Sequence, residues 1–103
     1  MTHLGLTDAL KEASGGHGQA WQYTASLARL VIRVWFEDAS TSGIYFVCSG
    51  CRRIELSTHW HPVQLVVAQP DERREWWLLN DGDHCRVECT MIFAVRSDEF
   101  LQL

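Results

Sequence analysis

Apolar and polar residues alternate along most of this chain with the two-residue period of a β-strand. In residues 29–37, one side of the predicted strand carries four large apolar residues: Leu30, Ile32, Val34 and Phe36. Arg33 and Trp35 fall on the other side. Because successive side chains of a strand point to opposite faces, the pattern predicts a half-buried antiparallel strand. Residues 21–27 alternate in the opposite phase, so we expect a bulge, bend or break near residues 27 and 28.

Turn-forming segments divide the rest of the chain into short strands. Residues that favour turns gather in three segments: 39–43, 57–62 and 70–74. Between these segments, residues 44–48 and 63–69 are rich in β-branched and aromatic side chains, which are typical of strands. Gly50 predicts a bulge that lets residues 44–56 run as one bent strand.

The segment REWWLLNDGDHCRVEC predicts a β-hairpin. Asp81 and Gly82 suit the two central positions of a type I′ turn, which needs positive φ at both. A two-residue turn fixes the register and places Trp77 opposite Arg86. The same alternation, followed to residue 95, predicts a row of core-facing side chains: Cys85, Val87, Cys89, Met91, Phe93 and Val95.

Short strands joined by turns, with little helix, are typical of a mainly β protein. We predict an antiparallel β-sandwich or small barrel of about six strands with a short N-terminal helix. The helix is expected over residues 7–13 with Thr7 as its N-cap, and the glycines that follow end it. The expected organisation is a short helix and flexible lead-in (1–19), a single antiparallel β domain (20–97) and a C-terminal tail (98–103).

Composition and charge narrow the class of protein. The 103 residues suit one hydrophobic core, and 47% of them are hydrophobic. A net charge of −4 argues against nucleic acid as a partner, because phosphates attract a basic surface. No apolar run approaches the roughly 18 residues of a membrane span, and the first residues do not resemble a signal peptide. We therefore expect a cytoplasmic protein without a membrane partner. The preference for arginine over lysine favours a bacterial origin.

The segment CSGC, residues 48–51, raises the question of metal or redox chemistry. Four cysteines in a cytoplasmic chain favour free thiols over disulfides. A thioredoxin-like pair lies at the start of a helix, whose dipole lowers a thiol pKa, whereas the RRIEL that follows CSGC is predicted to be a strand. A four-cysteine zinc site is disfavoured as well, since Cys85 and Cys89 are separated by about 13 Å along a regular strand.

A mixed zinc site is the strongest metal hypothesis. If residues 49 and 50 form a tight turn, Cys48 and Cys51 become cross-strand neighbours. His59 and His61 lie on one side of an extended segment, so that the candidate ligands are Cys48, Cys51, His59 and His61. The structural alternative, which we favour, makes Cys48 a small core residue at the end of an apolar strand.

Five tryptophans are the unusual feature of the composition. Alternation directs Trp35 outward beside Arg33. It also directs Trp77 outward with Arg86, where a cross-strand cation–π pair is expected. Outward tryptophans are covered either by another part of the same domain or by a partner, because Trp and Arg are enriched at interface hot spots.

No motif of a catalytic or phosphate-binding site occurs in the sequence, and we predict a non-enzymatic module. Its predicted role is to bind a protein partner, or a second copy of itself as a homodimer, through an aromatic-rich sheet face. The predicted partner-binding residues are Trp35, Trp77, Arg33 and Arg86. The alternative is a small zinc-binding domain that uses the CSGC pair with His59 and His61. No cofactor other than zinc is expected.

Overall fold

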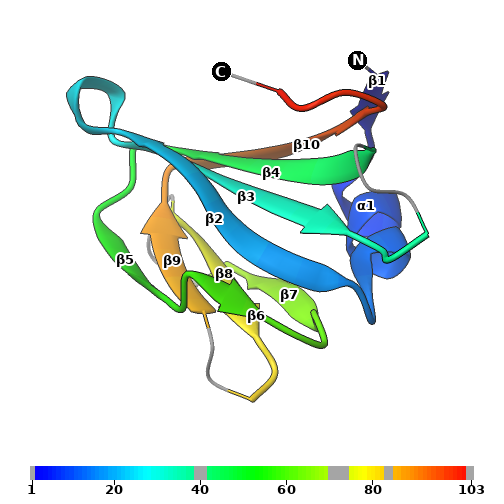
Figure 1. The fold of residues 1–103 in the computed structure, drawn as a ribbon. Coiled ribbons are helices and arrows are strands. Elements are labelled where there is room, and N and C mark those ends of the chain that lie inside the picture. The colour runs from blue at the N-terminus through cyan, green and yellow to red at the C-terminus, as the bar shows by residue number, and fades with distance from the viewer. Residues whose placement is uncertain (1, 39–41, 70–74, 83–84, 102–103) are drawn as a thin grey trace.

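Two antiparallel β-sheets face each other and enclose most of the apolar side chains (Figure 1). The computed structural model describes residues 2–38, 42–69, 75–82 and 85–101. The six-stranded sheet contains, in spatial order, β1 (Thr2–Leu4), β10 (Met91–Ser97), β4 (Gly43–Ser49), β3 (Arg29–Trp35), β2 (His17–Thr24) and β6 (His59–Trp60). The four-stranded sheet contains β5 (Arg53–Leu56), β9 (Cys85–Cys89), β8 (Trp76–Asn80) and β7 (Leu65–Ala68). This open, sandwich-like arrangement confirms the predicted fold class, and the described residues form ten short strands in place of about six.

The alternation that the sequence predicts for β3 is confirmed. Leu30, Ile32 and Val34 are buried between the two sheets. Val31 belongs to a second, smaller apolar cluster, which lies on the outer side of the six-stranded sheet. The inward row stops at Val34, because Phe36 lies beyond the end of the strand and is 38% exposed.

The predicted break between β2 and β3 is also confirmed. A single 3₁₀ turn over Ala25–Leu27 ends the β2 segment, and Ala28 then adopts a left-handed conformation with φ of 45°. A shift in the pairing of β2 with β3 between Ala20 and Gln22 marks a β-bulge. The turn and the bulge together explain why the hydrophobic pattern changes phase between the two strands.

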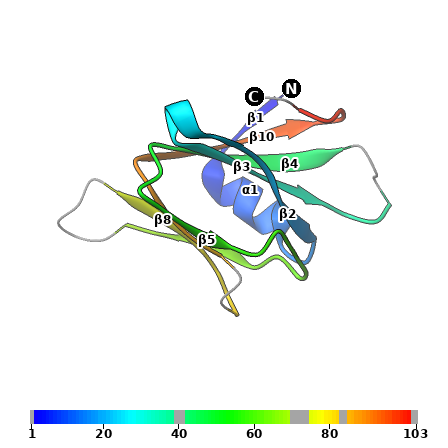
Figure 2. The ribbon, with the colours of Figure 1, turned by 60° about the vertical axis from the view of Figure 1, so that its left-hand side comes forward.

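The helix α1 (Leu6–Ala13) lies between the two sheets at one end of the sandwich (Figure 2). Its N-cap is Gly5, without a side-chain hydrogen bond, so the prediction that Thr7 caps the helix is wrong. Ala9 and Ala13 are fully buried, and their small side chains let the helix approach β10 and β7 closely. A helix of eight residues has little stability alone, so this packing is what supports it. Within the described residues, no helix is long and apolar enough to cross a membrane.

The residues before the helix are paired with the six-stranded sheet. β1 pairs with β10, with Thr2 opposite Arg96 and Leu4 opposite Ala94. Glu12 of the helix forms an ion pair with the same Arg96. The N-terminal segment is therefore attached to the edge of the six-stranded sheet through both backbone and side chains.

The chain passes from one sheet to the other at CSGC. β4 ends at Ser49 in the six-stranded sheet, and β5 begins at Arg53 in the four-stranded sheet. Gly50 has φ of 64°, which favours glycine, and a Cβ built there would lie 2.3 Å from the Thr90 side-chain oxygen. The predicted bent strand over residues 44–56 is thus two strands in two sheets, and the predicted tight turn with cross-strand thiols does not form.

The chain changes sheets again at β6, at β7 and finally at Thr90, where β9 ends and β10 begins. The passage at Thr90 corrects the predicted core-facing row. Val87 and Cys89 are buried between the sheets as expected, but Met91 is 55% exposed. Phe93 and Val95 pack in the outer apolar cluster instead. Because the chain changes sheets at Thr90, the alternation in β9 does not determine which side of β10 faces the core.

The hairpin of β8 and β9 forms, but its predicted register is wrong by two residues. Trp77 lies opposite Glu88 and not opposite Arg86, because the loop between the strands is longer than a two-residue turn. Gly82 has the expected positive φ, of 98°. Residues 83 and 84 lie outside the described part of the chain. A shift of two residues keeps every side chain on its predicted face, so Trp77 still points away from the core.

A buried amide connects the two sheets at the end that carries β6, a strand within the predicted loop 57–62. Trp60 is 3% exposed, and its indole N–H donates to the Asn80 side-chain oxygen at 3.2 Å. The backbone N–H of Gln64 donates to the same oxygen at 2.8 Å, and the Asn80 amide donates to the Asp81 carbonyl at 2.9 Å. Asn80 is itself 5% exposed, so these groups depend on it for their hydrogen bonds.

We predict that Asn80→Ala lowers the free energy of unfolding by about 2–4 kcal/mol, because two N–H groups lose their acceptor. Gln64→Ala, which removes only an exposed hydrogen bond to Ser14, is the control and is expected to cost less than about 1 kcal/mol. Urea unfolding followed by tryptophan fluorescence measures both. Equal, small losses for the two variants would contradict the role given to Asn80.

Candidate functional site

The four residues predicted to bind a partner lie on two different surfaces. Arg33 and Trp35 are on β3 and face the outer side of the six-stranded sheet, beside Tyr45. Trp77 and Arg86 are on β8 and β9 and face the outer side of the four-stranded sheet. The single aromatic-rich face expected from the sequence is therefore two faces, on opposite sides of the sandwich.

The C-terminal tail covers part of the first of these faces. The Trp21 indole N–H donates to the Leu101 carbonyl at 2.6 Å, and the Leu101 N–H donates to the Tyr45 hydroxyl at 3.2 Å. The Phe100 ring stacks on Trp21 with ring centres 5.4 Å apart. The Arg33 guanidinium lies 4.7 Å from the ring centre of Phe100. The chain thus supplies intramolecular cover for this face.

Arg33 is a charged residue held almost entirely out of water. It is 3% exposed, and its guanidinium also lies 4.7 Å from the ring centre of Trp35. One guanidinium nitrogen donates to the Ser42 carbonyl at 3.5 Å. Aromatic faces attract a cation, which offsets part of the cost of removing the charge from water. Arg33 therefore takes part in the packing of its own domain.

The second face carries the cation–π pair that the sequence predicts. The Arg86 guanidinium lies 4.7 Å from the ring centre of Trp77. The observed register makes the two residues diagonal neighbours, since Trp77 is opposite Glu88 and Arg86 is opposite Leu79. Diagonal neighbours on antiparallel strands are within reach of long side chains.

A buried carboxylate organises the charges on this outer face. The Glu88 side chain is only 3% exposed and contacts three arginines: Arg52, Arg53 at 3.8 Å and Arg86 at 3.1 Å. Glu75 accepts from Arg52 at 3.0 Å, and Glu55 accepts from Arg53 at 2.7 Å. These two hydrogen-bonded carboxylates raise the pKa of their arginine partners. Three arginines and three glutamates therefore neutralise one another on one surface.

An open groove of about 530 Å³ lies beside these charges, near the end of the hairpin. Its lining includes Val66, Leu79, Asp81 and Arg86. Val66 is 51% exposed and lies opposite Leu79 across the β7–β8 pair. In Figure 2, no helix or strand of the described residues covers the outer side of the four-stranded sheet. Apolar side chains at the centre, a polar rim and the absence of cover make this face the candidate binding site.

The four cysteines are free thiols within the apolar interior and at its corner. The Cys89 thiol donates to the Trp76 carbonyl at 3.6 Å, and the Cys51 thiol donates to the Cys48 carbonyl at 3.3 Å at the passage between the sheets. Cys85 is separate and donates to the Leu78 carbonyl at 3.8 Å. Cys48 is fully buried, as the structural interpretation of CSGC expects.

The surroundings of these thiols oppose ionisation. Burial raises the pKa of Cys85 to about 12. The hydrogen bond to Cys48 and burial raise the pKa of Cys89 to about 12. The hydrogen bond to Cys89 and then burial raise the pKa of Cys51 above its usual range. Because the thiolate is the nucleophile and the metal ligand, this arrangement favours packing over redox or metal chemistry.

The structure separates the two halves of the predicted zinc site. Cys48 lies opposite Leu30 at one end of β3, whereas His17, which stacks on His59 and His61, lies opposite Trp35 at the other end. Five residues of strand span roughly 17 Å. Cys48, Cys51, His59 and His61 therefore do not surround one ion.

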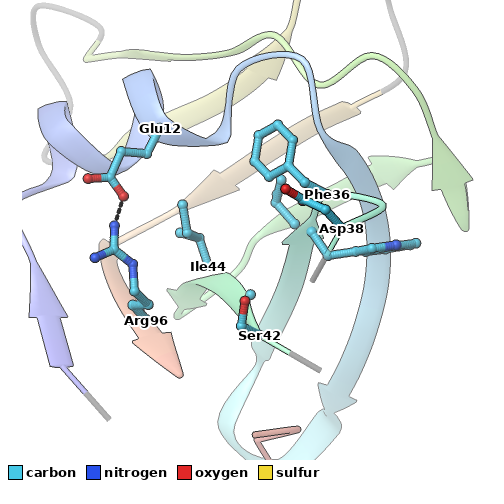
Figure 3. A pocket seen from close by; sticks show the side chains of 9 residues that line it. Glu12, Phe36, Asp38, Ser42, Ile44 and Arg96 are labelled. Carbon is cyan, nitrogen blue, oxygen red and sulfur yellow. Dashed lines mark ion pairs between the residues drawn. The ribbon is translucent and has the colours of Figure 1, made fainter. Parts of the chain in front are cut away.

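A pocket of about 330 Å³ lies where the helix meets the ends of β3, β4 and β10 (Figure 3). Figure 3 shows the ion pair of Glu12 and Arg96 on one side of it, with Asp38 and Phe36 on the other. The nine residues that line it include no histidine or cysteine. Among these nine residues Arg96 is the one cation, and it is paired with Glu12.

Comparison with family models, curated proteins and solved structures finds no match for this chain. The assignment of a role therefore depends on the geometry alone.

Sequence patterns identified Trp77 and Arg86 but missed the carboxylate between the arginines. Glu88 is the outward residue of a strand, where a charged side chain is ordinarily solvated. Only the flanking charges at residues 52, 53 and 86 distinguish it, and these come together through strand pairing that is distant in sequence. The sequence did not indicate His17 either, because it predicts a loop over residues 57–62, where β6 forms and pairs with β2.

We predict that Cys48, Cys85 and Cys89 react slowly with a disulfide reagent in native protein at about pH 8, because burial limits access to all three and a raised pKa leaves few thiolates at Cys85 and Cys89. Cys51 is more exposed, but its raised pKa is expected to make it slower than an ordinary surface thiol. Denatured protein, in which all four thiols react at once, is the control. Rapid modification of both Cys85 and Cys89 in native buffer would contradict their placement in the core.

Proposed function

We propose that this chain is a non-enzymatic module that associates with a second copy of itself through the outer face of the four-stranded sheet. The observation that carries the proposal is a sheet face that no helix or strand of the described residues covers, with the partly exposed Trp77 and Arg86 at its centre and the half-exposed Val66 beside them. Large aromatic residues and arginines dominate the binding energy of many interfaces, and exposed apolar patches on a small protein often mark such sites.

The charges on this face favour a second copy as the partner. The protein carries a net charge of −4, which repels another copy over most approaches. On this face, however, Arg52 is paired with Glu75 and Arg53 with Glu55, and the region as a whole is close to neutral. This surface carries both arginines and glutamates. When two copies meet across a two-fold axis, the arginines of one copy can face the glutamates of the other, as an isologous dimer requires.

The contrast with the six-stranded sheet supports the choice of face. There, the tail residues Phe100 and Leu101 cover Trp21 and Arg33 within the same chain. The tail has no counterpart among the described residues on the outer side of the four-stranded sheet. A partner on the four-stranded sheet therefore covers Trp77 as the tail covers Trp21 and Arg33 on the six-stranded sheet.

We predict a concentration-dependent dimer that Val66→Glu disrupts. Position 66 is half exposed in the single chain but buried in the proposed dimer. A glutamate there is expected to weaken association by about 2 kcal/mol or more, roughly thirty-fold in the dissociation constant. Sedimentation equilibrium measures the change. Trp77→Ala is expected to weaken the dimer by a similar amount, while circular dichroism shows that both variants remain folded.

Met91→Glu is the matched control, because Met91 is 55% exposed and Val66 is 51% exposed, but Met91 lies on the other sheet. The dimer should survive this change. A wild-type protein that stays monomeric up to about 100 µM, which corresponds to a binding free energy weaker than about 5–6 kcal/mol, would contradict the proposal. So would equal weakening by the two glutamate substitutions.

A further inference from the structure

Three histidines gather on the outer side of the six-stranded sheet, away from the proposed dimer face. His17 begins β2, while His59 and His61 lie on and just after β6, which pairs with β2. The ring centre of His17 is 4.2 Å from that of His61 and 5.6 Å from that of His59. Trp35 also stacks on His17, with ring centres 5.4 Å apart, and its ring centre lies 5.6 Å from that of His59.

Alternation and backbone hydrogen bonds hold this cluster in place. Trp60 is buried in the core, so its two histidine neighbours in the chain both point outward. The Gly15 N–H donates to the Val63 carbonyl at 2.8 Å, and the Val63 N–H donates to the Gly16 carbonyl at 2.9 Å. These backbone bonds join the segment that precedes His17 to the segment that follows His61. The backbone, and not contact between the imidazole rings, therefore holds the three histidines near one another.

A carboxylate and an open pocket adjoin the imidazoles. The Glu37 carboxylate lies 3.3 Å from the His17 Nε2 atom, and its side chain is 87% exposed. His17, Glu37, Asp38 and His61 contribute to the lining of a pocket of about 470 Å³. Three imidazoles with one carboxylate form a donor set that suits zinc, and nickel or copper as well.

We propose that His17, His59 and His61 bind a divalent transition-metal ion, zinc in the first instance, with Glu37 beside the site. In their stacked rotamers the nitrogens do not converge, and within the described residues no group of three or more His, Cys, Asp or Glu side chains is arranged to hold an ion. Two imidazoles that share one zinc ion hold their ring centres about 5 Å apart, given Zn–N bonds of about 2.0–2.1 Å. The observed separations of 4.2 and 5.6 Å bracket this value. The proposal therefore requires the three side chains to leave their stacked rotamers so that their nitrogens converge on one ion.

This site differs from the one that the sequence suggests. It keeps His59 and His61 but takes its other donors from His17 and Glu37. It excludes Cys48 and Cys51, which lie at the opposite end of β3 with thiols that resist ionisation. It is also independent of the dimer, because Val66 and Trp77 are on the other sheet.

Titration of untagged protein with zinc chloride, followed by calorimetry, tests the proposal. One ion per chain is expected to bind with an affinity in about the micromolar range or tighter. His59→Ala and His61→Ala each remove one donor from an exposed position, so the fold should persist while the affinity falls at least roughly ten-fold. Zinc should also raise the thermal midpoint of the wild-type protein, and the shift should be lost in His61→Ala.

His3→Ala and Cys51→Ser are the matched controls, and both should bind zinc as the wild type does. His3 is an exposed histidine on β1, at the far edge of the same sheet from β6. Three results would overturn the proposal: no zinc binding at millimolar concentration, unchanged binding by both His59→Ala and His61→Ala, or loss of binding in Cys51→Ser. The last result would point to the thiols instead.

Discussion

Two of the four passages of the described chain between its sheets lie against each other, and they decide which sides of β5 and β10 face the core. β4 gives way to β5 across Gly50, and β9 gives way to β10 across Thr90. The Thr90 N–H and hydroxyl both donate to the Ser49 carbonyl, at 3.0 and 3.1 Å. The Arg52 N–H donates to the Glu88 carbonyl at 2.8 Å on the other side of the same corner. The corner needs a left-handed residue without a side chain, which only glycine supplies at low cost.

The outer faces of the sandwich follow from this corner. Since β5 and β9 pair on the far side of it, Arg53 and Arg86 reach Glu88 and form a neutral surface around Trp77. The chain that emerges from Thr90 forms β10 and ends in a tail that covers Trp21 on the outer side of the six-stranded sheet. Among the described residues, no such tail lies on the outer side of the four-stranded sheet.

Local patterns predicted the strands well and the passages between sheets poorly. The alternation of Leu30, Ile32 and Val34 identified the core face of β3, because burial on one side imposes that period directly. Met91 was misplaced, because alternation continues through Thr90 in the sequence while the chain changes sheets in space. The tryptophan and arginine of the second face were identified by their outward phase. Glu88 and His17 contact residues that strand pairing brings near, and a single sequence does not specify that pairing.

The most direct test of this account is the stability of Gly50→Ala measured against Gly15→Ala by equilibrium unfolding. Both glycines have positive φ, of 64° and 87°, but a Cβ at Gly15 would meet nothing within 4 Å, whereas one at Gly50 would strike Thr90. The account predicts a loss of about 1 kcal/mol for Gly15→Ala and about 2–5 kcal/mol for Gly50→Ala. Equal losses would show that the corner is not closely packed, and the assignment of the two outer faces would lose its basis.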